Sequence, residues 1–271
     1  MRTFNDVFPH PKPIIAMAHL LPLPGSPHYD TTIGINGNVD HVLRDVEALQ
    51  HAGVDAIMFG NEGDRPYLTK ATPETLAAMA VIVTRITPHL DIPYGINYLW
   101  DPVASVALAH ATGASFVREI FTGVYESDMG LWIPDAATAL RLRRNLASDT
   151  LLLYNVNAEF ASLIGNRTVA ARAKSAVFAS LADGICVSGP MTGETVAMPD
   201  LIDVKQAVGD TVPVIANTGV RLDNVHEVLA RADAAIVGSS LKRHGDTWQP
   251  VDRDRATHFM NAVRDIRKTT T

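Results

Sequence analysis

The sequence predicts a single (β/α)₈ barrel that spans residues 1–271. Short apolar runs alternate with longer amphipathic segments from one end of the chain to the other. The length of 271 residues is close to the roughly 250 that are typical of such barrels. A weak internal repeat of two β/α units supports the same architecture. A doubly wound open sheet is the alternative, but such sheets seldom carry this many evenly spaced units.

The predicted strands are short, and both their odd and their even positions are apolar, as expected for strands that are covered on both faces. They are Ile14–His19, Ala56–Glu62, Tyr94–Leu99, Phe116–Phe121, Leu151–Val156, Gly184–Ser188, Val214–Asn217 and Ala234–Ser239. Amphipathic helices are expected between them, because prolines mark helix starts and glycines mark left-handed helix ends, at Pro73, Pro102, Pro199, Gly53, Gly113 and Gly209.

The internal repeat lies where the strands begin and end. Similar tetrapeptides lead into the even-numbered strands: Gly-Val-Asp-Ala at 53–56, Gly-Ala-Ser-Phe at 113–116, Ala-Asp-Gly-Ile at 182–185 and Ala-Asp-Ala-Ala at 232–235. Two odd-numbered strands share another pattern: Asp-Ile-Pro-Tyr-Gly-Ile-Asn ends at Asn97, and Thr-Val-Pro-Val-Ile-Ala-Asn ends at Asn217. A period of two units is typical of an eight-fold barrel built from quarter-barrels. No linker rich in Pro, Gly and Ser divides the chain, so one domain is expected.

Composition excludes several classes of partner. The formal net charge is −6 and the pI is near 5.9, so no basic surface for nucleic acid is expected. No apolar run approaches the roughly 18 residues of a membrane-spanning helix, and the first residues lack the apolar core of a signal peptide. A cytoplasmic protein is therefore expected. The single cysteine, Cys186, lies in an apolar run and is interpreted as a buried thiol. Many barrels are oligomers, which slightly favours a homo-oligomer.

Two connections are longer than the others and are candidate lids. Leu20–Gly37 follows the first predicted strand and Thr122–Pro134 follows the fourth. Both follow the carboxyl ends of strands, which form the catalytic face of a barrel. Ordinary surface loops are the alternative interpretation, above all for the second.

Polar residues end every predicted strand, and a full ring of them indicates a polar ligand. A barrel brings the carboxyl ends of its strands to one face, where active sites form. The residues expected to bind substrate there are Asn61, Asn97, Arg118, Asn155, Asn157, Ser188 and Asn217.

The last two strands are expected to end in a phosphate-binding site. Glycines let the backbone approach an anion, and a short helix after Ser239 would add its positive end. Barrels often bind phosphate at this place. The expected residues are Thr218, Gly219, Gly238, Ser239 and Ser240. Tight turns without a ligand are the alternative. Lys242 is expected either to assist by its charge or to face solvent.

Glu62, Glu119 and His19 are the candidate catalytic residues. A carboxyl group half-buried at a barrel mouth has a raised pKa and exchanges protons near neutral pH. Because successive strand residues face opposite ways, Arg118 and Glu119 are not both expected to point into the barrel. A structural ion pair is the alternative for either glutamate. Together with His19 the glutamates could bind a divalent metal, but no metal-binding motif is present, so no metal site is assigned.

The sequence lacks the signature motifs of several reaction classes. No lysine lies within a predicted strand, which disfavours a Schiff-base aldolase. The chain contains no P-loop, no dinucleotide-binding G-x-G-x-x-G motif and no G-x-S-x-G nucleophile elbow.

The segment Ile15-Ala-Met-Ala-His-Leu-Leu-Pro-Leu-Pro-Gly-Ser-Pro27 resembles the opening signature of the BtpA/SgcQ family. The resemblance continues at Phe121-Thr-Gly-Val, Val187-Ser-Gly-Pro-Met-Thr-Gly193 and Ile236-Val-Gly-Ser-Ser-Leu-Lys-Arg-His-Gly245, so it spans nearly the whole chain. It implies a (β/α)₈ barrel related to phosphate-binding barrels. It also implies the label of the family, a factor for photosystem I biogenesis or stability in cyanobacteria, with relatives near sugar-utilisation genes elsewhere.

This chain departs from the family pattern after the seventh strand. It has Asn217-Thr218-Gly219 where relatives are expected to have a turn of Gly-Ser-Gly type, so two side chains occupy the turn. Family members lack an agreed reaction, and the resemblance therefore supports the fold and the position of the site more than the chemistry.

Two functions follow from the sequence. The first is an enzyme that acts on a small phosphorylated metabolite, a sugar phosphate or a nucleotide-derived compound, by proton transfer or isomerisation, or by lyase or hydrolase chemistry. The second is a non-catalytic BtpA-like factor that assists biogenesis of a photosystem or another membrane complex. It requires an exposed apolar patch, for which Leu20, Leu21 and Leu23 are the candidates.

Overall fold

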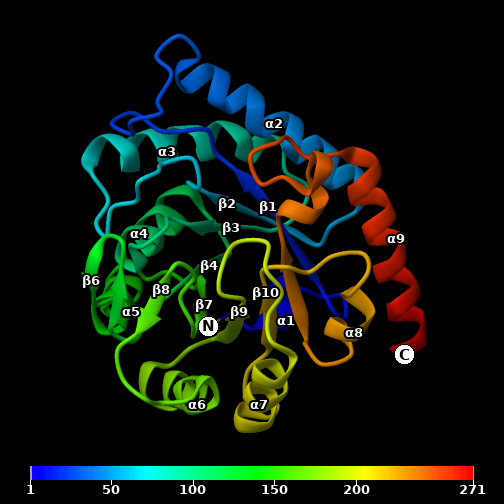
Figure 1. Cartoon of the computed structure of the whole chain (residues 1–271). Coiled ribbons are helices and arrows are strands. Elements are labelled where there is room, and N and C mark those ends of the chain that lie inside the picture. The colour runs from blue at the N-terminus through cyan, green and yellow to red at the C-terminus, as the bar shows by residue number, and fades with distance from the viewer. Residues whose placement is uncertain (1, 271) are drawn as a thin grey trace.

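The computed structural model describes residues 2–270 and confirms the predicted barrel. Eight parallel strands close in the order β1-β11-β10-β9-β7-β4-β3-β2 (Figure 1). Each begins at the predicted residue, and five end one or two residues earlier than expected. The strands are β1 (Ile14–His19), β2 (Ala56–Gly60), β3 (Tyr94–Asn97), β4 (Phe116–Glu119), β7 (Leu151–Asn155), β9 (Gly184–Ser188), β10 (Val214–Asn217) and β11 (Ala234–Val237).

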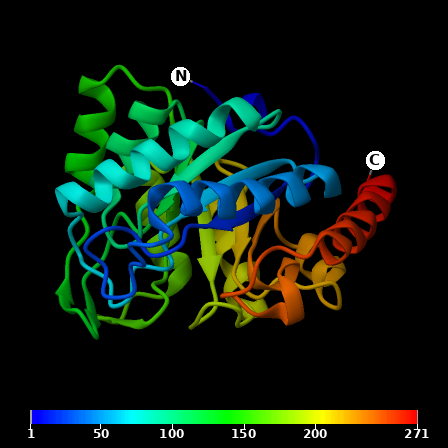
Figure 2. The ribbon, with the colours of Figure 1, turned by 90° about the horizontal axis from the view of Figure 1, so that it is seen from above.

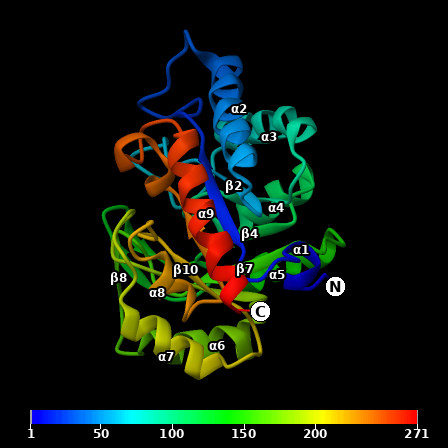
Figure 3. The ribbon, with the colours of Figure 1, turned by 90° about the vertical axis from the view of Figure 1, so that its right-hand side faces the viewer.

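Helices surround the strands, and the last helix packs against α2 to complete the ring (Figures 2 and 3). The α-helices are α1 (Phe4–Val7), α2 (Gly34–Ala52), α3 (Pro73–Ile86), α4 (Pro102–Thr112), α5 (Ala136–Asn145), α6 (Val169–Ser180), α7 (Met198–Val208), α8 (Val225–Leu229) and α9 (Arg253–Thr270). Short 3₁₀ turns cover Thr87–His89, Ser239–Leu241 and Arg243–Gly245.

The predicted helix signals are found with one difference. Pro73 and Pro102 open their helices, and Gly53 and Gly113 end helices in the left-handed conformation. Gly209 also has a positive φ, but its ψ of −131° differs from a left-handed cap.

The barrel interior is closed at its amino-terminal end. Side chains that alternate along the strands, such as Met58 and Phe116, fill the interior. Val7 and Phe8 cover it from below, and the rings of Phe8 and Phe116 lie 5.3 Å apart. A ligand therefore enters from the opposite end, where the strands carry their polar last residues.

A second, three-stranded sheet lies beside the barrel and was not predicted. It pairs β5 (Tyr125–Ser127) with both β6 (Gly130–Trp132) and β8 (Ala161–Leu163) (Figure 1). The loop Thr122–Pro134, expected as a lid, is thus an ordered hairpin, and no residue of it lines the cavity described below. Its strands are too short to give a local signal, and the pairing with β8 joins two loops that are far apart in the sequence.

The Leu20–Gly37 connection packs onto the barrel. The first turns of α2 begin at Gly34, inside the expected loop. Leu20 and Leu23 are buried, which corrects the expectation of an exposed apolar patch there. The backbone N–H of Leu23 donates to Asp64 at 2.7 Å and holds the loop against the next one.

Within residues 2–270, no helix has both the length and the apolar character that crossing a membrane requires. Cys186 is buried inside the barrel, as predicted, and burial raises the pKa of its thiol to about 12.

Gly95 is expected to be essential for packing in the barrel. A Cβ atom on Gly95 would lie 2.2 Å from the ring of Phe116. Gly95→Ala should therefore lower the free energy of unfolding by roughly 1–3 kcal/mol, measured by urea denaturation. The double variant Gly95→Ala/Phe116→Leu should recover part of this loss, because the smaller side chain makes room for the methyl group. Strictly additive effects of the two substitutions would contradict the account.

Candidate active site

A cavity of about 600 Å³ opens at the carboxyl ends of the barrel strands. Its size lies within the roughly 300–1,000 Å³ that small-molecule sites occupy. Most of the residues predicted for the site line it: His19, Glu62, Arg118, Glu119, Asn155, Asn217, Thr218, Gly219, Gly238, Ser239 and Ser240.

The other four predicted residues, Asn61, Asn97, Asn157 and Ser188, lie behind this lining. Asn61 accepts a hydrogen bond from the backbone N–H of Leu99 at 2.8 Å and so joins two loops of the mouth. Asn157 accepts from the backbone N–H of Ser188 at 2.9 Å and donates to its carbonyl oxygen. These side chains orient the lining and do not reach the cavity themselves.

Arg118 and Glu119 both reach the cavity although they are neighbours on β4. Phe116 packs inside the barrel, so alternation directs Arg118 inward as well. Glu119 is the last residue of the strand, where the chain turns away. Its carboxylate accepts from Nδ2 of Asn97 at 2.5 Å and from the backbone N–H of Ile120 at 2.9 Å.

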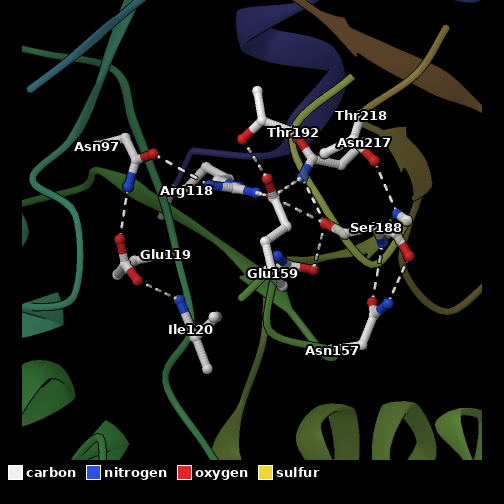
Figure 4. A network of polar contacts seen from close by, with 12 residues as sticks. Asn97, Arg118, Glu119, Ile120, Asn157, Glu159, Ser188, Thr192, Asn217 and Thr218 are labelled. Carbon is white, nitrogen blue, oxygen red and sulfur yellow. Dashed lines mark hydrogen bonds and ion pairs between the residues drawn. The ribbon is translucent and has the colours of Figure 1, made fainter. Parts of the chain in front are cut away.

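Glu159 joins most of the polar side chains of the site into one network (Figure 4). Nη2 of Arg118 donates to Oε1 of Glu159 at 2.7 Å, and Nη1 donates to Oδ1 of Asn97 at 3.1 Å. Asn217 and Thr192 also donate to Glu159, at 3.3 and 3.0 Å. Arg118 and Asn217 are each held by a further hydrogen bond, to Asn97 and Ser188, and this fixes the charged pair.

Glu159 was not among the residues expected from the sequence. It lies in the loop after β7, beyond the predicted strand, and its partners come from distant parts of the chain. The one local signal is the alternation of Asn155, Asn157 and Glu159, which continues the period of the strand past its end.

Glu62 and His19 form a second polar pair across β1 and β2. Gly60 makes room for it, since a Cβ there would lie 2.4 Å from Oε2 of Glu62. Oε1 of Glu62 lies 3.3 Å from Nε2 of His19, and both side chains are largely buried. The hydroxyl of Tyr67 donates to the carbonyl oxygen of Glu62 at 3.1 Å and holds the loop in place.

Burial shifts the pKa values of these groups toward their neutral forms. It raises the pKa of Glu62 to about 7, and it raises the pKa of Glu119 to about 7 as well. Burial, and then the charge of Lys242, lowers the pKa of His19 well below 6.5. Two carboxyl groups that are half-protonated near neutral pH can each donate or accept a proton.

Four buried polar atoms of the lining have no hydrogen-bond partner within residues 2–270. They are Nδ1 of His19, Nδ2 of Asn155, Nε of Arg118 and Oε2 of Glu62. A buried polar atom without a partner is costly, by roughly 1–3 kcal/mol, so it needs a reason. Donors and acceptors from a bound polar ligand would satisfy all four.

The turns after β10 and β11 form the other side of the cavity. Thr218 and Gly219 have positive φ angles of 70° and 61°, and a Cβ on Gly219 would lie 2.3 Å from the backbone of the neighbouring loop. The hydroxyl of Thr218 accepts from the backbone N–H of Gly189 and donates to the carbonyl oxygen of Glu194. Within the described residues, no hydrogen bond is made by the backbone N–H groups of Gly219, Val220, Ser239 and Ser240.

Comparisons with known proteins agree with this architecture. The model of the BtpA family matches residues 10–265. The chain belongs to the BtpA family. It is 45% identical to the putative sgc region protein SgcQ of Escherichia coli (strain K12), over 99% of this chain and 100% of that protein. It is 35% identical to the photosystem I biogenesis protein BtpA of a Synechocystis species, over 93% of this chain and 88% of that protein.

Solved structures resemble this BtpA-family barrel in fold. A dihydropteroate synthase from Xanthomonas albilineans superposes with a TM-score of 0.60, over 96% of this chain and 93% of that one. The identity is 14%, so the likeness establishes the TIM-barrel fold alone.

In this member of the BtpA family, Lys242 does not face solvent, which was one of the two expectations, and its charge acts on His19 and Glu62 from behind the lining. It is buried, its Nζ lies 3.9 Å from Oδ2 of Asp45, and it does not line the cavity. Asp45 in turn accepts from the backbone N–H of Val251 at 2.8 Å. The pair fastens the chain after β11 to α2. Among residues 2–270, no cluster of three or more His, Cys, Asp and Glu side chains is arranged to hold a metal ion.

The pKa of Glu62 makes stability depend on pH. Its pKa is about 7 in the native protein against an ordinary value of 4.5. Between these values the native protein keeps a proton that the unfolded chain has lost, so the free energy of unfolding falls as the pH rises through this window. Glu62→Gln carries no such proton. We therefore compare the free energy of unfolding of Glu62→Gln with that of the wild type. From pH 4.5 to pH 8 this difference should increase by on the order of 1–3 kcal/mol in favour of the variant.

The measurement is urea denaturation at a series of pH values, with Glu47→Gln on the exposed face of α2 as the matched control. The control should follow the wild type at every pH. If the Glu62→Gln curve also ran parallel to the wild type, the raised pKa would be wrong.

Proposed function

We propose that the protein is an enzyme that acts on a small phosphorylated metabolite, a sugar phosphate or a nucleotide-derived compound, by proton transfer or isomerisation. The observation that carries the proposal is the pair of buried carboxyl groups, Glu62 and Glu119, which line one cavity with pKa values of about 7. A general acid or base works best when its pKa lies near the working pH.

The phosphate is assigned to the turns after β10 and β11. Four backbone N–H groups without hydrogen-bond partners within residues 2–270 belong to residues that line the cavity there. Backbone N–H groups in glycine turns bind phosphate oxygens without the desolvation cost of a buried cation. In this assignment Gly219, Val220, Ser239 and Ser240 hold the anion, and the hydroxyl of Thr218 shapes the turn.

The remaining polar groups fit proton transfer. Glu62 exchanges one proton with the substrate, and the neutral imidazole of His19 orients the Glu62 carboxyl group. Glu119 exchanges a proton at a second atom of the substrate. Arg118, held by Glu159, orients the substrate between them. No lysine among the described residues lines the cavity, so a Schiff-base route has no amine to use. Lyase or hydrolase chemistry would use the same two carboxyl groups.

A non-catalytic assembly factor is the second candidate. It is favoured by the name of the Synechocystis relative, a photosystem I biogenesis protein. Its surface would include the exposed apolar side chains of Leu131 in β6 and Ile133 directly after it, since Leu20 and Leu23 are buried. A pull-down from cells that recovers no membrane protein would count against this role. The cytoplasmic location and the homo-oligomeric state expected from the sequence stay predictions.

The enzyme proposal predicts that Glu62→Gln and Glu119→Gln fold normally and lose turnover. A thermal-shift screen of sugar phosphates and nucleotides first identifies a ligand, because a compound at 100 times its Kd adds roughly 2.7 kcal/mol of stability. Conversion of that compound is then followed by nuclear magnetic resonance. Each substitution removes a proton-transfer group and should lower kcat by roughly 10²–10⁴-fold.

Glu47→Gln on α2 is the matched control and should retain full turnover. Wild-type rates in both site variants would contradict the assignment of the two glutamates. A screen in which no phosphorylated compound stabilises the protein would contradict the proposed function itself.

A further inference from the structure

One wall of the cavity is aromatic and apolar. It consists of Tyr67, Leu99, Trp100, Ile120 and Phe160, which all line the cavity. The rings of Tyr67 and Trp100 are inclined by only 28° with centroids 6.5 Å apart. The two rings therefore present similarly oriented flat faces, on which a planar ring can stack.

The backbone of this wall is held in an unfavourable conformation. Trp100 and Phe160 have φ angles of 70° and 56°, in the left-handed region that bulky residues rarely adopt. Such conformations persist only where the surroundings impose them, and they cluster at binding sites. Trp100 is held in place by Trp132, whose ring centroid lies 4.6 Å away in an edge-to-face contact.

The small sheet supplies this support. Trp132 of β6 and Tyr125 of β5 form an apolar cluster with Trp100 that is separate from the barrel core. Because β8 comes from the loop after β7, the sheet ties that loop to the hairpin. The small sheet thus has a specific effect on the cavity, because it fixes the position of the Trp100 ring.

The aromatic wall lies across the mouth from the assigned phosphate turns. In the closed barrel, β3 and β4 are each four strands away from β10 and β11, respectively, which is the opposite side of the ring. Trp100 follows β3 and Ile120 follows β4, whereas Gly219 follows β10 and Ser239 follows β11. A ligand that touches both sides must cross the barrel mouth.

Polar groups lie between these two ends. Nδ2 of Asn155 and Nε of Arg118 are buried, line the cavity and have no partner within residues 2–270. Oε2 of Glu62 adds an acceptor. Two donors and one acceptor at the centre suit a hydroxylated linker such as a ribose.

We infer that the substrate is a phosphorylated riboside with a planar heteroaromatic ring, of the size of a nucleoside 5′-monophosphate, and that its ring lies on the wall of Tyr67 and Trp100. This inference rests on the proposed function, whose phosphate turns anchor the other end of the ligand. It selects the nucleotide-derived class over simple sugar phosphates. A cavity of about 600 Å³ holds a ligand of that size.

The test compares binding of AMP, GMP, CMP and UMP with ribose 5-phosphate, which lacks the ring, by isothermal titration calorimetry. At least one nucleotide should bind about tenfold more tightly, since stacking of one base on aromatic side chains contributes roughly 5- to 150-fold. Tyr67→Leu should remove this preference, so that the nucleotide and ribose 5-phosphate bind with similar Kd values. Tyr67→Phe keeps the ring, loses only the hydroxyl, and should retain the preference. Trp100→Leu is the second ring variant and should act like Tyr67→Leu.

Substitutions at the opposite end separate this inference from the proposed function. Ser239→Asp places a carboxylate at the phosphate turn and should weaken binding of every phosphorylated compound at least tenfold relative to the neutral Ser239→Asn. If Ser239→Asp behaved so but nucleotides and ribose 5-phosphate bound equally, the ring site would be wrong and the phosphate site would stand. The ring site would also be wrong if the preference for nucleotides survived in both Tyr67→Leu and Trp100→Leu. If none of the compounds bound, both proposals would fail.

Discussion

Closure of eight parallel strands is the constraint on which the whole site depends. It brings every strand to one mouth at its carboxyl end, and alternation allows only every second residue to face inward. The lower inward positions are apolar and packed, as Met58 and Phe116 are. The last inward positions, such as Arg118, Asn155 and Asn217, are polar and open onto the cavity. The chemistry is thus concentrated at the one end of the barrel that α1 does not cover.

Burial at this mouth has two opposite electrostatic outcomes. Glu159 lies 2.7 Å from Arg118, so its negative charge is compensated and the pair forms a fixed support. Glu62 and Glu119 lack a partner of equal strength, and desolvation raises the pKa of each to about 7. The same environment therefore supplies both a rigid frame and two groups that exchange protons, which is the division of roles that acid–base catalysis requires.

Local sequence patterns predict much of this molecule and miss what depends on long-range pairing. The strand starts follow from apolar runs and their flanking turns. Strand ends are overestimated, because apolar residues such as Ile120 and Phe121 continue past the last ladder hydrogen bond: Ile120 lines the cavity and Phe121 stacks on Tyr154. The polar ring at the mouth follows from strand periodicity. Glu159 and the aromatic wall around Trp100 do not, because distant loops hold them in place.

The central claim is that the turns after β10 and β11 bind a phosphate group. Amide nuclear magnetic resonance spectra recorded during titration with inorganic phosphate test it most directly. The account predicts saturable shifts that are largest for the backbone N–H groups of Gly219, Val220, Ser239 and Ser240, because these have no partner within residues 2–270. Shifts that are absent there, or that are confined to other parts of the chain, would contradict it.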